Sequence, residues 1–91
     1  MPLFLVRYHY TDDAVALTRV RPRHREFLAT LPGLTASGPT ADNGAALVVE
    51  ADSADDVSKL LDADPFAVEG LIAGRQVVEW TLVLGRWSQA R

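Results

Sequence analysis

Three segments of the chain place apolar residues on both faces of a predicted strand: residues 3–10, 45–50 and 75–84. Side chains of a strand alternate between its faces, so a strand with one solvated face alternates apolar with polar residues. These segments break that alternation and therefore need cover on both faces of their sheet. A chain of 91 residues forms one domain, residues 1–91, without room for a second core.

A long helix is predicted after the first of these strands. Residues 14–31 have helical periodicity, and Asp12 or Asp13 is available to cap the start. Pro32-Gly33 is a strong terminator. Pro22 lies inside the segment and lacks the amide donor that a helix interior requires. We therefore expect a kink at Pro22, or two successive helices that meet there.

A β-hairpin follows the helix. Residues 34–37 are typical of a short strand that ends at Gly38-Pro39, and Asp42-Asn43-Gly44 is a turn sequence. We expect residues 34–37 to pair antiparallel with residues 45–50 across a somewhat long loop.

Two helix starts follow the hairpin. Ser53-Ala54-Asp55-Asp56 resembles a capping box and predicts a helix as far as Leu61. Asp64-Pro65 has the preferred order of N-cap and first helical residue, so a one-turn helix is predicted to run to Glu69 and stop at Gly70.

The resulting order, β-α-β-β-α-β, is the ferredoxin-like α+β pattern with a four-stranded antiparallel sheet. Both helices of that fold cover one face of the sheet and leave the other face open. Here the open face would expose a large apolar surface, which marks an interaction site. The alternation alone therefore predicts a homodimer packed sheet to sheet.

Charge and residue usage exclude several classes of protein. The net charge is −3, whereas a general nucleic-acid binder needs a basic surface. The only basic cluster is Arg19, Arg21, Arg23 and Arg25, which we interpret mostly as a solvated flank. The chain has no cysteine, which excludes disulfides and thiol catalysis. Apolar runs are too short for a membrane span and no signal peptide is recognisable, so we expect a soluble, cytoplasmic protein without a membrane partner.

His24 lies on the apolar stripe of the first helix, four residues after Val20 and four before Leu28. A buried imidazole needs a hydrogen-bond partner, and its protonation then depends on its neighbours. Such a histidine is more often a satisfied core residue than a functional one, unless a partner is found elsewhere. The only other histidine, His9, does not give the spacing of a metal site, so we expect no metal.

Several short motifs occur in a recognisable order: Arg21-Pro22-x-His24, Ser37-Gly38-Pro39, Asp62-Ala63-Asp64-Pro65-Phe66, Gly70 and the closing Glu79-Trp80-Thr81-Leu82-Val83-Leu84-Gly85. Together they resemble the YciI-like (YCII-related) family from Leu3 to Gly85. The resemblance implies a dimeric α/β barrel, built from two ferredoxin-like subunits joined by their sheets. It also implies a pocket with a catalytic pair, which corresponds here to His24 and Asp64. The activity attached to related sequences is a lyase-type elimination on a chlorinated, hydroxylated aromatic ring.

The favoured hypothesis is a cofactor-free acid–base enzyme, of the lyase or isomerase type, that acts on a small hydroxylated compound such as an aromatic ring. His24 would move the proton and Asp64 would orient the imidazole. Substrate contacts are expected from the Ser37 hydroxyl, the Gly38 amide and the Arg21 guanidinium. Tyr8, Tyr10 and Phe66 would line an aromatic pocket.

Each residue of this hypothesis also has a structural interpretation. Ser37-Gly38-Pro39 is typical of a turn, Tyr8 and Phe66 of a core, and Asp64 of a helix cap. A cap can still accept a hydrogen bond from His24. The alternative function is a non-catalytic small-molecule-binding or interaction dimer, because fold does not decide function.

Overall fold

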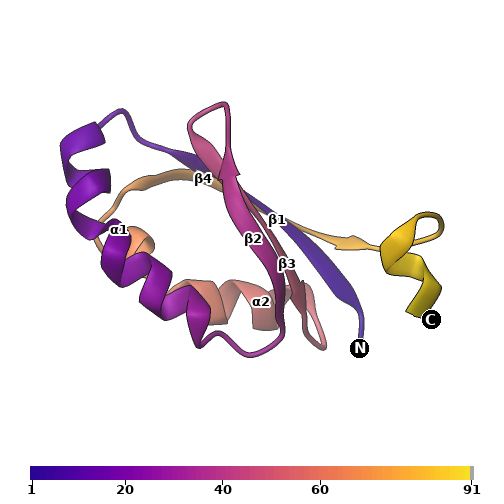
Figure 1. Cartoon of the computed structure of the whole chain (residues 1–91). Helices are drawn as coiled ribbons and strands as arrows, with labels where there is room; N and C mark the ends of the chain where they lie inside the picture. The colour runs from indigo at the N-terminus through magenta and orange to yellow at the C-terminus, as the bar shows by residue number, and fades with distance from the viewer. Residues whose placement is uncertain (91) are drawn as a thin grey trace.

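The structure, a computed structural model, describes residues 1–90, so Arg91 of the predicted domain lies outside the described residues. Its four strands are β1 (Leu3–Tyr10), β2 (Leu34–Thr40), β3 (Gly44–Glu50) and β4 (Ile72–Trp80). They form one antiparallel sheet in the order β2-β3-β1-β4. The helices that connect the strands lie on one side of this sheet, whereas the last helical segment lies beyond the end of the sheet (Figure 1). The predicted ferredoxin-like α+β fold is confirmed.

Three helices begin where local capping sequences predict: α1 (Ala14–Ala29), α2 (Ala54–Leu61) and α3 (Pro65–Val68). A 3-10 helix that was not predicted, η1 (Arg86–Ala90), follows the last strand. The side chains of Asp13, Ser53 and Asp64 each accept a hydrogen bond from a backbone amide of the first turn, at 3.1, 3.1 and 2.9 Å. Each carboxylate or hydroxyl satisfies a donor that has no partner within the helix.

The first helix continues through Pro22 instead of dividing into two helices. Its axis changes direction along its length, as the indigo and purple turns show (Figure 1). It ends at Ala29, before the predicted Leu31, because the amides of Thr30 and Leu31 bond to Phe27 and Leu28, three residues back. Gly33 then turns the chain with φ of +79°.

Several strand boundaries differ from the prediction, most of all those of β2 and β4. β2 continues through Gly38 and Pro39 to Thr40, because it is an edge strand and Pro39 needs no second ladder partner. The loop to β3 is therefore short, residues 41–43, and the predicted turn at Ser37-Gly38-Pro39 is wrong. β4 starts at Ile72 and ends at Trp80. Trp80 pairs with Leu3, the first residue of β1, so no residue of β1 remains to pair with residues after Trp80. Residues 81–84 lie beyond the sheet.

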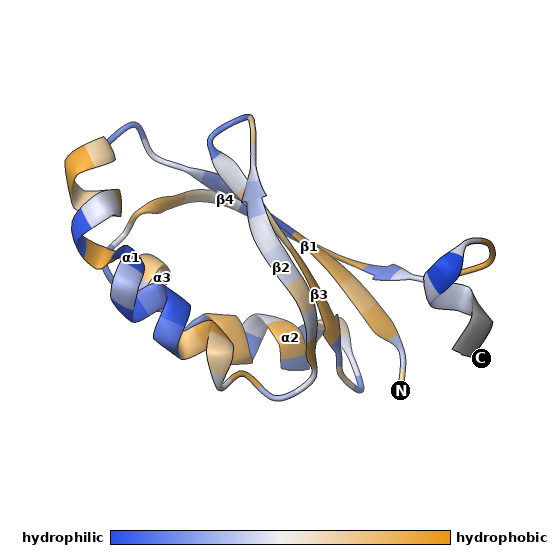
Figure 2. Ribbon diagram, in the orientation of Figure 1, coloured by the Kyte–Doolittle hydropathy of each residue, from blue (hydrophilic) through white to orange (hydrophobic). Residues whose placement is uncertain are grey.

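The main core lies between the sheet and the helices. Alternate residues of β1 and β3 pack against α1 and α2, and the buried set is Phe4, Val6, Tyr8, Leu28, Leu31, Ala45, Leu47, Val49, Ala51, Val57 and Leu61. The opposite face, here called the open face, includes Leu5, Val48 and Val78, which are paired across three strands. Trp80 and Val78 of β4 are 38% and 53% exposed. The hydropathy colouring shows that β1 and β3 are largely hydrophobic, whereas β2 is mostly intermediate and the middle of α1 is hydrophilic (Figure 2).

Candidate functional site

Residues 40 positions apart in the chain meet under the long helix. His24 lies on the buried side of α1, together with Val20 and Leu28. Asp64 lies immediately before α3 and is completely buried. The Nδ1 atom of His24 is 2.8 Å from Oδ1 and 3.0 Å from Oδ2 of Asp64. The imidazole therefore has a charged hydrogen-bond partner in a place that water does not reach.

Asp64 accepts two further hydrogen bonds, so its burial is compensated. The Tyr8 hydroxyl donates to Oδ2 at 3.0 Å, and the Phe66 amide donates to Oδ1 at 2.9 Å. Burial, followed by the charge of Asp64, raises the pKa of Tyr8 far above its usual range, so the hydroxyl remains a donor. Asp64 is thus both the cap of α3 and the partner of His24.

The bond to Asp64 determines which ring nitrogen of His24 is available to accept a proton. An ionised carboxylate can only accept hydrogen bonds, so the bond between Asp64 and His24 requires a hydrogen on Nδ1. The neutral ring then carries its free lone pair on Nε2. A carboxylate that selects the tautomer in this way also stabilises the imidazolium that forms when Nε2 takes a proton.

Aromatic packing holds the plane of the imidazole. The ring of Phe66 stacks on His24 with centroids 4.1 Å apart and an interplanar angle of 15°. The rings of Tyr10 and Phe66 pack edge to face, with their centroids 5.2 Å apart. The His24 ring is therefore fixed by stacking as well as by its hydrogen bonds.

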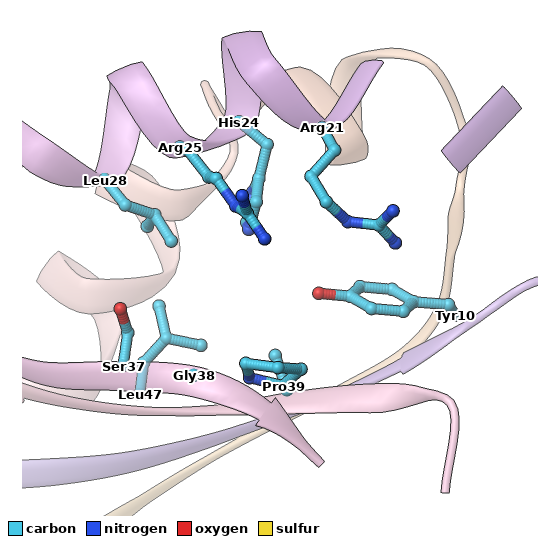
Figure 3. Close-up of a pocket in the computed structure, with 10 residues that line it drawn as sticks. Tyr10, Arg21, His24, Arg25, Leu28, Ser37, Gly38, Pro39 and Leu47 are labelled. Carbon is cyan, nitrogen blue, oxygen red and sulfur yellow. The ribbon is translucent and has the colours of Figure 1, made fainter. Parts of the chain in front are cut away.

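His24 forms part of a pocket of about 360 Å³ between α1 and the β2–β3 hairpin (Figure 3). The lining residues are Tyr10, Arg21, His24, Arg25, Leu28, Ser37, Gly38, Pro39, Ala45 and Leu47. Ser37 and Pro39 pair with Leu47 and Ala45, so their side chains share the helix-facing side of the sheet. The extension of β2 through Pro39 is what forms this wall.

The structure brings most of the predicted site together, with two changes. Arg21, Ser37, Gly38 and Tyr10 line the pocket with His24. Tyr8 and Phe66 do not line it: Tyr8 bonds to Asp64, and Phe66 stacks on His24. We interpret both as support for the pair, not as substrate contacts.

Arg25 is exposed, as expected for the solvated flank, but it also lines the pocket, which was not predicted from the sequence. The available signal was its position four residues after Arg21, which places the two side chains on one face of the helix. Burial and the charge of Asp64 raise the pKa of Tyr10, whereas the Arg21 cation opposes that change. The phenol of Tyr10 is therefore a hydrogen-bond donor at the pocket.

Among residues 1–90, no group of three or more histidines, aspartates or glutamates is placed to hold a metal ion. The same part of the chain has no helix long and apolar enough to cross a membrane.

Together, these features describe a small ferredoxin-like protein with a buried imidazole–carboxylate pair beside a pocket. Residues 1–81 match the YCII-related domain, and the chain belongs to that family. A comparison with curated proteins found no match.

Several solved structures are similar to this chain. 5-Chloro-2-hydroxyhydroquinone dehydrochlorinase (TftG) from Burkholderia phenoliruptrix AC1100, solved with 2,5-dihydroxybenzoquinone, is 26% identical with a TM-score of 0.78. The match covers 87% of this chain and 93% of that one. A NIPSNAP domain protein from Burkholderia xenovorans is 12% identical (TM-score 0.56), covering 91% of this chain and 95% of that one. A candidate antibiotic biosynthesis monooxygenase from Nitrosomonas europaea is 16% identical (TM-score 0.55), covering 92% and 100%. These last two similarities concern the fold alone.

Proposed function

We propose that this protein is a cofactor-free acid–base enzyme, of the lyase or isomerase type, acting on a small hydroxylated compound such as an aromatic ring. One observation carries the proposal: His24 is bound to Asp64 through Nδ1 while its side chain lines a pocket of ligand size. A histidine that served only the core would not need a pocket beside it.

In the proposed reaction, Nε2 of His24 removes a proton from a carbon or hydroxyl of the bound compound. The electron pair left behind expels a leaving group or shifts a double bond, and the imidazolium returns its proton to the product or to solvent. Asp64 stabilises the imidazolium throughout. Arg21, Ser37 and Gly38 are proposed to hold the oxygen on which negative charge develops.

The similarity to TftG supports this choice of reaction class. That protein is a dehydrochlorinase of a hydroxyhydroquinone, and it was solved with a dihydroxylated quinone. Removal of hydrogen chloride is a proton transfer coupled to loss of a leaving group, which requires a base but no net oxidation. A residue such as His24 is suited to that chemistry.

We also propose that the protein functions as a homodimer through the open face. Leu5, Val48 and Val78 form an apolar strip across three adjacent strands, and Trp80 adds a large exposed ring. An apolar face of this kind is typical of a buried subunit interface.

The alternative is a non-catalytic binding dimer, and the capping role of Asp64 is the observation that favours it. Turnover assays on His24→Asn distinguish the two. An asparagine amide can still donate to Asp64, but it replaces Nε2 with no base. Chlorinated and hydroxylated hydroquinones would be screened for loss of substrate and release of chloride. The enzyme proposal predicts that the wild type turns over at least one compound and that His24→Asn loses about 10²–10⁴-fold of that rate. Equal rates in the two proteins would contradict it.

A further inference from the structure

Two arginines of α1 extend into the pocket, one on each side of His24 in the sequence. Arg21 and Arg25 are four residues apart, and both guanidinium groups project from the helix toward the strands (Figure 3). Within residues 1–90, neither takes part in an ion pair. The pocket therefore contains two cations that the described part of the chain does not neutralise.

Arg21 and Arg25 carry like charges four residues apart on one helix, a spacing that is mildly destabilising. Arg19 and Arg23 have the same spacing, but both lie outside the pocket. Arg21 is partly buried and Arg25 is exposed, and both form part of the pocket wall. A ligand that supplies negative charge would reduce the repulsion between them.

The remaining surface of the pocket also favours an anion. None of its lining residues is an aspartate or glutamate, although the whole chain has a net charge of −3. Asp64, the partner of His24, does not line the pocket and already accepts hydrogen bonds from Tyr8, His24 and Phe66. A local cationic surface in an acidic protein attracts anionic ligands.

The size of the pocket suits a ligand with one ring. Its volume of about 360 Å³ is at the small end of ligand sites. Leu28, Pro39 and Leu47 supply apolar contacts, and Tyr10 supplies an aromatic ring. A guanidinium binds oxygen anions through paired N–H groups, so two guanidiniums one helical turn apart can hold two such oxygens.

We propose that the pocket selects a planar monocyclic dianion, with one acidic oxygen at Arg21 and another at Arg25. This inference rests on the proposed function and narrows its substrate class to hydroxylated rings that bind in the doubly ionised form. The cations would bind charge that is already present, and they would also stabilise electron density that moves onto the oxygens when His24 removes a proton.

Calorimetric titration with two probes of similar size tests the proposal. 2,5-Dihydroxybenzoquinone is a dianion at neutral pH, whereas hydroquinone is uncharged there. We expect the wild type to bind the dianion at least about tenfold more tightly, because charge-assisted hydrogen bonds are stronger. Arg21→Met and Arg25→Met should each weaken dianion binding about 10- to 100-fold and leave hydroquinone binding unchanged. Arg23→Met is the matched control and should change neither.

Three results would overturn the proposal. They are absence of dianion binding, a dianion affinity in Arg25→Met equal to that of the wild type, and equal losses for both probes. His24→Asn separates this proposal from the enzymatic one. It should retain charge-dependent binding of the dianion while losing turnover. If turnover did not depend on His24 but binding remained charge-dependent, the enzyme proposal alone would fail.

Discussion

At the residue scale, Asp64 has the largest number of roles in the site. It caps α3, accepts from Tyr8 and binds His24, and all three roles use the same two oxygens. A completely buried carboxylate is tolerated because each oxygen has protein donors. The tautomer of His24 thus depends on Asp64, which does not line the pocket.

Tyr8→Phe tests whether one of those residues positions Asp64. The change removes a hydrogen bond to a charged group and should lower the free energy of unfolding by about 1.5–3 kcal/mol. With the substrate found by screening, kcat should fall more than KM changes, because Tyr8 does not line the pocket. Urea unfolding and steady-state kinetics measure the two effects. An altered KM with unchanged kcat would show that Tyr8 contacts substrate instead.

The raised pKa of Tyr8 also predicts how stability depends on pH. An unfolded tyrosine loses its proton near pH 10, whereas the folded Tyr8 keeps it to higher pH. The unfolded state therefore binds fewer protons above pH 10. The stability associated with Tyr8 is fully present below that pH and is lost as pH rises above it. Urea unfolding at several alkaline pH values should show a shallower decline in Tyr8→Phe, and an identical decline would contradict this assignment.

At the element scale, helix starts depend on local sequence, whereas strand limits depend on partners. Asp13, Ser53 and Asp64 were each predictable as caps from a few neighbouring residues. The end of β4 at Trp80 was not predictable from neighbouring residues, because it depends on where its partner strand β1 begins. Pro39 continues β2 because the strand lies at an edge, and no local pattern shows which strand that will be.

The residues of the site also differ in whether local sequence could predict them. The place of His24 on the buried stripe followed from helical spacing. Its pairing with Asp64 came from the family resemblance, because periodicity does not relate residues on α1 and α3. The place of Arg25 beside the pocket was not predicted, because its spacing from Arg21 shows a shared helix face but not that β2 lies opposite that face.

Comparing two helix caps separates the capping role of Asp64 from its role as the buried partner of His24. Ser53→Ala removes the cap of α2 and should cost about 1 kcal/mol of unfolding free energy without changing turnover. Asp64→Ala removes a cap and a buried partner together and should cost about 3–5 kcal/mol. Thermal or urea unfolding measures both. Equal losses would mean that the buried pair adds nothing beyond the cap.

At the scale of the whole molecule, one sheet has two different roles. Its helix-facing side forms the core and one wall of the pocket, whereas none of α1, α2 and α3 lies on the open face (Figure 1). Apolar residues on the open face are explained if a second copy covers them. The pocket and the proposed interface then lie on opposite sides of the sheet.

Val78→Asp should disrupt the proposed dimer, because it buries a charge in an apolar interface. Val15→Asp is the control, since Val15 is also an exposed valine but lies at the start of α1. Sedimentation velocity should show a dimer for the wild type and for Val15→Asp, and a monomer for Val78→Asp. A monomeric wild type would contradict the proposed assembly.

The most direct test of the account is the tautomer of His24, read from the 15N chemical shifts of the two ring nitrogens while the ring is neutral. The structure predicts a hydrogen on Nδ1, bonded to Asp64, and a free lone pair on Nε2 at the pocket. A hydrogen on Nε2 would contradict the account, because the ring would then have no base to offer a ligand.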